Sequence, residues 1–396
     1  MPTTPRFATG IRRLFPGLIL AAAATLMVVA PAGAAVPKGP SGLRFYTPPT
    51  KLTGKHGDLI RARAVTGSTA LSAAARNYLV LYRSTSVRGK PVAVSGNISI
   101  PKGKAPKGGW PVVSWAHGTT GGADICAPSR TGAGGVAAQL NGWLQAGYAV
   151  ARTDYEGLGT PGPHPYLIGA SAGRSVTDIV TAAGQLDRRV GRRWAAVGVS
   201  QGGHAALFAG AVGPTWAPKL RLVGVDALAP GSHIKDEVEI ARSLTSPSPL
   251  SVIGSLLVAG VIASDPATFK ASGMLTPAAQ ALLPQVEQRC QDDLGKSDSW
   301  GGIAPAQILK DGYDRTALYR AFDESDPMRV TIKVPVLAQQ GTDDQLVFPF
   351  FTDAVVDGLR TNGATVDYRK YPGADHNGVV GAGRADTDTW LAQRLK

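Results

Sequence analysis

The most informative segment of the chain reads Trp194-Ala195-Ala196-Val197-Gly198-Val199-Ser200-Gln201-Gly202-Gly203-His204-Ala205-Ala206-Leu207-Phe208. The apolar residues at its start predict a short buried strand, and the Ala-rich residues at its end predict a helix. Between them lies a Gly-x-Ser-x-Gly motif, which in this context is typical of a nucleophile elbow. The sharp turn strains the central residue, and the flanking glycines avoid clashes. We therefore expect the Ser200 hydroxyl to project into a cleft above the helix N-terminus.

A candidate acid follows a later apolar segment. Residues Val334-Pro335-Val336-Leu337-Ala338 predict a strand, and the turn after it carries Asp343 and Asp344. We choose Asp344 as the catalytic acid because Asp-x-x-Val followed by a proline, here Pro349, is the usual form of the acid loop in serine hydrolases of this architecture. Asp343 fits a residue that stabilises the turn by bonding to local backbone.

A candidate base follows the last predicted strand. His376 lies in Tyr371-Pro372-Gly373-Ala374-Asp375-His376-Asn377-Gly378, and it is the only one of six histidines in the sequence that comes after Asp344. A lone histidine in a loop is ordinarily a surface imidazole. This one completes the chain order Ser, Asp, His that is typical of α/β-hydrolases.

These three residue types together predict acyl transfer. A serine hydroxyl is a poor nucleophile at neutral pH, so His376 would take its proton while Asp344 fixes the imidazole tautomer. The oxyanion that forms needs two donors. We expect one from the backbone N–H of Gln201 and the other from Thr119 or Thr120, in the glycine-rich loop that follows the predicted strand at residues 110–116.

The remaining pattern predicts an α/β fold. Residues 78–82 and 92–100 fit an antiparallel hairpin, residues 148–153 and 220–227 fit buried strands, and the apolar spacing from Val176 to Val190 fits a helix. Alternating strands and helices predict a mostly parallel sheet covered on both faces. We assign residues 35–230 and 331–396 to this core.

The alternation of strands and helices stops at residues 231–330, where helical stretches occur without a convincing strand. We interpret this part as a helical cap or lid inserted into the core. Residues Leu250 to Ile262 form a helix more apolar around its circumference than a solvent-facing helix should be, yet too short to cross a membrane. It is either buried inside the cap, which we favour, or a lid face that opens onto lipid or lines an acyl pocket.

The N-terminus predicts export. Residues 1–34 contain three arginines, an apolar run and the small-residue site Ala32-Gly33-Ala34, as in a secretory signal. Removing this segment lowers the formal net charge from +13 to +10. No basic motif interleaved with aromatic residues indicates a nucleic-acid partner. In an oxidising compartment Cys126 and Cys290 predict a disulfide between the oxyanion-loop region and the cap, and their spacing does not indicate a metal site.

Two further motifs indicate a family. The chain resembles the secretory lipase family of the lipase A type, both in the run from Ser114 to Ser129, with its Cys126-Ala127-Pro128-Ser129, and in Asp154-Tyr155-Glu156-Gly157-Leu158-Gly159. The resemblance covers nearly the whole chain after the signal. Some family members carry an acidic residue where this chain has Thr119 and Thr120, which leaves the second oxyanion donor open between the two.

The resemblance implies an α/β-hydrolase with a helical cap and an acyl tunnel. It implies a lipase or carboxylesterase with Ser200, Asp344 and His376 as its triad, a Cys126–Cys290 disulfide and no cofactor. Asp154 and Glu156 would brace the oxyanion loop. A secreted peptidase or acyltransferase could use the same triad, because a fold does not fix the acyl group or the acceptor. A non-catalytic envelope-binding protein is a further alternative, which the intact triad residues disfavour.

Overall fold

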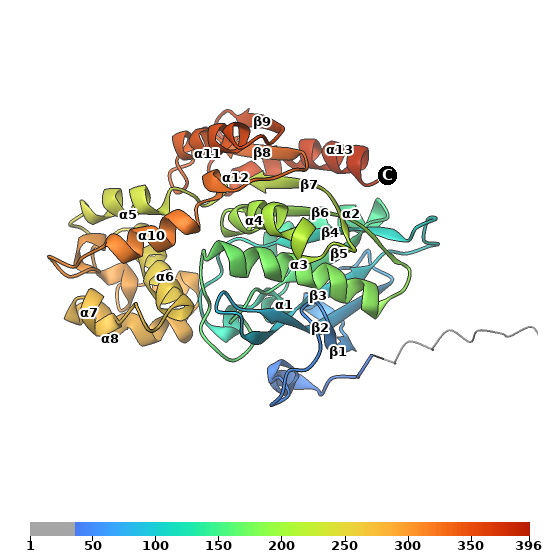
Figure 1. Cartoon of the computed structure of the whole chain (residues 1–396), viewed down its shortest axis with the longest axis horizontal. Coiled ribbons are helices and arrows are strands. Elements are labelled where there is room, and N and C mark those ends of the chain that lie inside the picture. Colours follow the sequence, from blue (N-terminus) through green and yellow to red (C-terminus); the bar gives the residue numbers. More distant parts are fainter. Residues whose placement is uncertain (1–35) are drawn as a thin grey trace, which may run out of the picture. The chain divides into compact units, whose positions relative to one another are not determined.

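The computed structural model describes residues 36–396, so the predicted secretory signal lies outside the described residues. Within them, the chain forms a nine-stranded sheet in the order β1-β2-β3-β5-β4-β6-β7-β8-β9 (Figure 1). The strands are β1 (Leu59–Ala64), β2 (Arg76–Thr85), β3 (Pro91–Ile100), β4 (Trp110–Ala116), β5 (Ala149–Thr153), β6 (Val190–Val199), β7 (Arg221–Leu228), β8 (Val336–Gly341) and β9 (Val366–Tyr371). From β1 to β5 each neighbouring pair is antiparallel, and from β5 to β9 each is parallel. The predicted mostly parallel sheet is confirmed.

Helices cover both faces of this sheet. The helices are α1 (Pro128–Thr131), α2 (Ala137–Gln145), α3 (Gly169–Leu186), α4 (Gln201–Trp216), α5 (Ile234–Arg242), α6 (Pro249–Ser264), α7 (Ala271–Met274), α8 (Pro277–Leu282), α9 (Gln291–Leu294), α10 (Thr316–Glu324), α11 (Pro349–Thr361), α12 (Gly378–Ala382) and α13 (Arg384–Arg394). On β4, Val112 and Ala116 belong to the apolar cluster that includes side chains of α3, α4 and α11, whereas Val113 and Trp115 belong to the cluster that includes side chains of α2, α12 and α13. This alternation is the two-residue period of a strand buried on both sides.

One predicted boundary was wrong. The helix expected from Val176 to Val190 ends at Leu186, and Val190 is the first residue of β6, opposite Trp110 of β4. A tight turn separates the two elements, with the Val190 N–H bonded to Asp187 O at 2.9 Å. Val190 happens to fit the helical period because it too faces the core, so spacing alone could not exclude it from the helix.

Between β7 and β8 the chain forms the helices α5 to α10 and contributes no strand to the sheet. They enclose an apolar core of their own, which includes Leu256 and Val261 of α6, Trp300, and Phe322 of α10. The predicted disulfide joins this part to the sheet: Cys126 and Cys290 are bonded, with their Cα atoms 5.4 Å apart. No helix within residues 36–396 combines the length and apolar character needed to cross a membrane.

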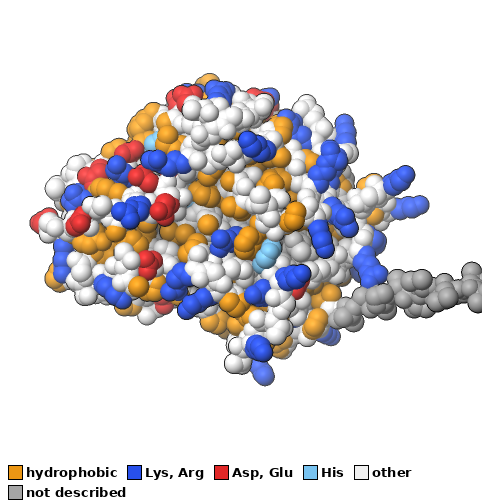
Figure 2. All heavy atoms as spheres, viewed as in Figure 1, with side chains coloured by type: hydrophobic (Ala, Val, Ile, Leu, Met, Phe, Trp, Pro, Cys, Tyr) orange, Lys and Arg blue, Asp and Glu red, His pale blue; other side chains and the backbone are white. Residues whose placement is uncertain are grey.

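Charge is unevenly spread over the face drawn in Figure 2. Most of the acidic side chains visible there lie over the cap helices at the left, whereas basic side chains crowd the opposite end, where Figure 1 places α13 and the C-terminus. Basic side chains also lie over the cap on this face, but there they are mixed with acidic ones, whereas few acidic side chains are visible at the opposite end.

Candidate active site

Ser200 lies in the turn between β6 and α4, at the carboxyl end of its strand. Its backbone has φ 58° and ψ −119°, a combination that residues other than glycine rarely adopt. The Ser200 N–H donates to Leu228 O at 2.9 Å, and Ser200 O accepts from the N–H groups of His204 at 3.0 Å and Gly231 at 3.1 Å. These bonds to β7, to α4 and to the loop after β7 hold the strained serine in place.

The glycines of the motif are required by close backbone contacts. A Cβ atom on Gly198 would lie 2.2 Å from Gly202 O, and a Cβ atom on Gly202 would lie 1.9 Å from Ala116 O at the end of β4. Both distances are far shorter than a van der Waals contact. The motif therefore reflects how tightly the first turn of α4 packs against β4 and β6.

Asp344 lies in the loop after β8, and His376 lies in the loop after β9. Because β8 and β9 are parallel neighbours, both loops lie at the same end of the sheet. The Asp343 N–H donates to Ala374 O at 3.0 Å, which ties one loop to the other. His376 Nδ1 donates to Asp344 Oδ2 at 2.8 Å. The structure thus brings together the acid and the histidine chosen from the sequence.

The Asp344 side chain is fully buried, and its charge is stabilised by several donors. Oδ1 accepts from the N–H groups of Leu346 and Val347, both at 2.9 Å, and Oδ2 also accepts from Gln340 Nε2 at 3.1 Å. Burial by itself would raise the pKa of Asp344, but the hydrogen bond and charge of His376, together with the two backbone donors, hold that pKa below its ordinary value. The ionised carboxylate keeps the proton of His376 on Nδ1, so Nε2 is the nitrogen left to act as a base.

Ser200 and His376 line the same cavity, which has a volume of about 1160 Å³. Thr119 of the oxyanion loop also lines it, and Leu250 and Ile253 of α6 form part of the wall on the cap side. Most side chains of this apolar helix are buried, as we favoured, and the end with Leu250 and Ile253 borders the cavity. A lid face that opens onto lipid or lines an acyl pocket stays a prediction.

The two threonines considered as oxyanion donors differ in their surroundings. Thr119 borders the cavity, and its hydroxyl is hydrogen-bonded to the Tyr166 hydroxyl at 2.8 Å. Thr120 is tied to the cap, because its carbonyl accepts from the Gln291 N–H at 3.0 Å. Within residues 36–396, the backbone N–H groups of Thr119, Thr120 and Gln201 all have no hydrogen-bond acceptor, so this property does not separate the two threonines. Of the two candidates, Thr119 is the one placed beside the cavity.

The side chain of Gln201 is held by a buried histidine that the sequence analysis left without a role. Gln201 Nε2 donates to His164 Nε2 at 2.9 Å, and His164 Nδ1 donates to Glu156 O at 2.7 Å. Burial lowers the pKa of His164 to about 4, so the ring is neutral and accepts the bond from Gln201. The residue that follows the nucleophile is thereby fixed through its side chain.

The oxyanion loop is braced by a different residue from those expected. The side chain of Asp154 accepts from the Ser129 N–H at 2.8 Å, and that of Glu156 accepts a hydrogen bond from α3. The direct contact comes from the residue between them, since the Tyr155 hydroxyl donates to His117 O at 2.9 Å. Among the described residues, neither carboxylate makes a hydrogen bond to residues 117–122, so the role expected of Asp154 and Glu156 stays a prediction.

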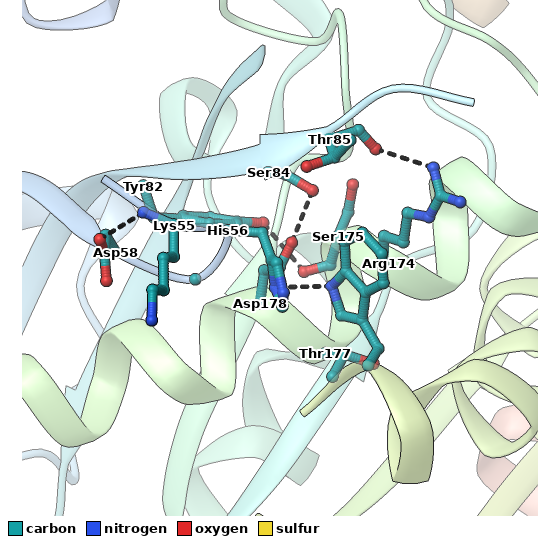
Figure 3. Close-up of polar contacts among 12 residues, drawn as sticks. Lys55, His56, Asp58, Tyr82, Ser84, Thr85, Arg174, Ser175, Thr177 and Asp178 are labelled. Carbon is teal, nitrogen blue, oxygen red and sulfur yellow. Dashed lines mark hydrogen bonds and ion pairs between the residues drawn. The ribbon is translucent and has the colours of Figure 1, made fainter. Parts of the chain in front are cut away.

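A second group of Ser, His and Asp side chains lies where β2 meets the helices α3 and α4 (Figure 3). Asp178 is fully buried and accepts hydrogen bonds from His56 Nδ1 at 2.9 Å, Ser84 Oγ at 2.7 Å and Trp216 Nε1 at 2.9 Å. Here the serine bonds to the carboxylate and not to the imidazole, so the group has no serine that a histidine could activate. It joins the N-terminal segment, β2, α3 and α4. In the described part of the chain, no three His, Cys, Asp or Glu side chains are placed to hold a metal ion.

Sequence comparison places the chain among lipases. A model of the secretory lipase family matches residues 136–396. A Lipase A of Moesziomyces aphidis is 29% identical over 228 residues, which cover 52% of this chain and 47% of that protein. A Lipase A of Arthroderma benhamiae is 25% identical over 352 residues, which cover 81% of this chain and 71% of that protein. The chain thus spans about half the length of the first relative and more of the second.

Solved structures share the fold at low sequence identity. Candida antarctica lipase A has a TM-score of 0.73 and 19% identity, over 86% of this chain and 85% of its own. The rice cell wall degrading esterase LipA from Xanthomonas oryzae has a TM-score of 0.70 and 18% identity, over 86% of this chain and 99% of its own. Both likenesses support the α/β-hydrolase architecture. Because the family match runs through β6, the cap and the loops after β8 and β9, the chain belongs to the secretory lipase family.

Proposed function

We propose that this protein is an exported serine hydrolase that cleaves the carboxylic esters of lipids. The observation that carries the proposal is the 2.8 Å hydrogen bond between His376 and Asp344, at the wall of a cavity that Ser200 also lines. Membership of the secretory lipase family supports both ester hydrolysis and export.

The proposed reaction has two acyl-transfer steps. Ser200 Oγ attacks the ester carbonyl carbon while His376 Nε2 takes the hydroxyl proton, giving a tetrahedral intermediate. This intermediate collapses as the bond to the alcohol breaks, and His376 returns the proton to the departing alcohol. Water then attacks the acyl-enzyme with His376 again acting as base, which releases the acid and restores Ser200. Asp344 stays ionised and stabilises the imidazolium in both steps.

The oxyanion would be stabilised by two backbone donors. Gln201 is the first residue of α4, so its N–H lies at the positive end of the helix dipole. We assign the second donor to the Thr119 N–H because Thr119 borders the cavity, whereas Thr120 is bonded to the cap. One donor of this kind typically contributes a factor of roughly 10²–10³ in turnover.

The cavity supports a lipid ester as substrate. Its volume of about 1160 Å³ is at or above the roughly 300–1,000 Å³ of most small-molecule pockets. Leu250 and Ile253 give the cap side of its wall an apolar surface on which an acyl chain would bury its methylenes. Ser200 and His376 border the same cavity, where an ester carbonyl would have to be placed.

The test is hydrolysis of p-nitrophenyl esters of increasing acyl length and of a long-chain triglyceride emulsion, by the chain without residues 1–34 and by its Ser200→Ala variant. We expect turnover of esters by the parent chain and none above background by the variant, with unchanged thermal unfolding. Faster cleavage of a matched peptide amide, or net transfer of the acyl group to an added alcohol in place of water, would contradict the assignment.

A further inference from the structure

A hollow of about 650 Å³ lies at the amino-terminal ends of the parallel strands, whereas Ser200 lies at their carboxyl ends. We call it the basic hollow. It is bordered by the loop before β4, the turn before β6 and the first residue of β7. Its wall carries several cations and no Asp or Glu; these cations include Lys107, Arg188, Arg192, Arg193 and Arg221.

Most of these cations lack a counter-charge. Lys107, Arg188, Arg192 and Arg221 are exposed, and none of them forms an ion pair with another residue in the range 36–396. Arg221 also stands directly opposite Arg193 in the parallel pairing of β6 with β7. Like charges at such positions are destabilising unless an anion lies between them. The hollow therefore presents positive charge that the folded chain itself leaves uncompensated.

Glycines allow the two loops that border the basic hollow to pack closely together. A Cβ atom on Gly109 would lie 2.6 Å from Gly191 N, and one on Gly191 would lie 2.5 Å from Gly108 O. The loop before β4 and the turn before β6 thus meet backbone against backbone, and the Trp110 N–H bonds to Arg189 O at 2.7 Å. This close packing fixes the two loops against each other, so the cations on either side of them, Lys107 and Arg192 among them, border one hollow.

The composition of the wall favours a polymer over a membrane. Docking to a lipid surface combines basic residues with apolar side chains that insert between the lipids. In the described residues the exposed large apolar side chains are Leu43, Ile125, Ile240 and Phe350, and none of them lines this hollow. Arginines predominate among its cations, and the guanidinium fork matches the oxygens of a phosphate. Figure 2 shows how basic side chains gather at this end of the molecule.

We propose that the basic hollow binds a linear polymer that bears phosphate groups. A polymer bound there would contact the enzyme at the amino-terminal ends of the strands. The catalytic cavity, at their carboxyl ends, would stay open to substrate. This inference does not depend on the catalytic assignment, because no residue of the basic hollow contacts the cavity that Ser200 lines.

The experiment compares two variants of equal net charge. The first removes four cations of the basic hollow: Lys107→Gln, Arg188→Gln, Arg192→Gln and Arg221→Gln. The matched control removes four exposed cations near the antiparallel edge of the sheet: Arg44→Gln, Lys51→Gln, Lys55→Gln and Lys90→Gln. Dissociation constants for inorganic polyphosphate are measured for the parent chain and both variants over a range of salt concentrations, with phosphatidylglycerol vesicles as a second probe.

We expect the first variant to bind polyphosphate at least about tenfold more weakly, and to lose about 3 from the slope of log affinity against log salt. The control should keep the parent's slope, and all three proteins should hydrolyse a soluble ester equally. Equal losses in the two variants would mean that net charge alone attracts the polymer and would overturn the proposal. Vesicle binding that depends on the same four cations while polyphosphate binding does not would replace it with membrane docking.

Discussion

Asp343 and Asp344 are neighbours in sequence but have different environments. Asp344 is buried and bonded to His376, whereas Asp343 is exposed and its carboxylate accepts from the Thr342 hydroxyl at 2.9 Å. Asp343 was expected to bond to local backbone through its side chain; its N–H contacts Ala374 O instead. The two carboxylates therefore allow a controlled comparison within one turn.

Changing Asp344 to Asn should lower kcat for ester hydrolysis by about 10⁴-fold, because the amide would favour the wrong imidazole tautomer. Asp343→Asn should change kcat far less, because Asp343 borders the cavity but its carboxylate bonds to the Thr342 hydroxyl and not to His376. Steady-state kinetics on one short-chain ester distinguish the two. Similar losses in both variants would show that Asp344 has no special role.

The packing around Gly202 makes a prediction about stability. Gly202→Ala should prevent folding or lower the melting temperature sharply, because its Cβ would overlap Ala116 O. Gly184 is the matched control: it lies in the interior of α3, and a Cβ there would meet no atom within 4 Å. Gly184→Ala should stabilise the protein by about 0.5–1 kcal/mol. Thermal unfolding measures both, and equal melting temperatures would contradict the contact.

Among the elements, β7 carries a buried carboxyl that links it to β8 and α13. Asp226 Oδ1 accepts from Gln339 Nε2 at 2.8 Å, and Oδ2 accepts from Thr387 Oγ1 at 2.6 Å. Burial raises the pKa of Asp226 from 3.8 to about 7, against the lowering effect of these two bonds. The folded protein therefore keeps a proton on Asp226 that the unfolded chain loses at lower pH.

The sign of the pH dependence follows from this difference. Between about pH 3.8 and pH 7 the unfolded state binds fewer protons, so the free energy of unfolding falls as pH rises, and above pH 7 the loss is complete. The full loss is on the order of 4 kcal/mol. Asp226→Asn should remove this slope and be relatively more stable above pH 7. Chemical denaturation of the parent chain and of Asp226→Asn across this pH range tests the prediction. A free energy of unfolding that varies with pH in the same way in both proteins would refute it.

The elements found from the sequence are those with continuous apolar runs. Strands β4 to β8 were predicted because both faces of the sheet are covered there, which leaves long buried runs. Strand β9 was also predicted, although its sequence VDYRKY is polar and half exposed at the edge of the sheet. Strand β1 was not predicted, since Leu59–Ala64 alternates with Arg61 and Arg63 at the edge of the sheet. The length of α3 was overestimated because Val190 faces the same core as the helix.

For the whole molecule, the cap and the sheet are joined by the covalent bond between Cys126 and Cys290 as well as by packing. The bond spans 164 positions of sequence. A loop of this length corresponds to roughly 5 kcal/mol of stabilisation in the chain-entropy description. It also lies next to the oxyanion loop, because Gln291 bonds to Thr120.

Replacing both cysteines with alanine should lower the free energy of unfolding by up to about 5 kcal/mol. Chemical denaturation of the variant and of the parent chain, with and without a reducing agent, measures the effect. Reduction should destabilise the parent and leave the variant unchanged. A parent chain that is insensitive to reduction would show that the bond does not constrain the fold.

Motifs and chain order were enough to predict Ser200, Asp344 and His376 as site residues, although neither gives any distance. They could not find Gln340 or His164, because each acts through a side-chain contact that no motif marks. They could not choose between Thr119 and Thr120 either. The two are neighbours in one loop, and they differ only in tertiary contacts: Thr119 borders the cavity, whereas Thr120 O bonds to Gln291 of the cap.

The central claim is that Ser200 is a nucleophile activated by His376. A fluorophosphonate probe, followed by mass spectrometry of the labelled peptide, tests this most directly in the parent chain and in His376→Ala. We predict rapid labelling at Ser200 in the parent chain, and labelling slowed by at least about a hundredfold in the folded variant. A label on another residue, or Ser200 labelled equally fast without the histidine, would contradict the account.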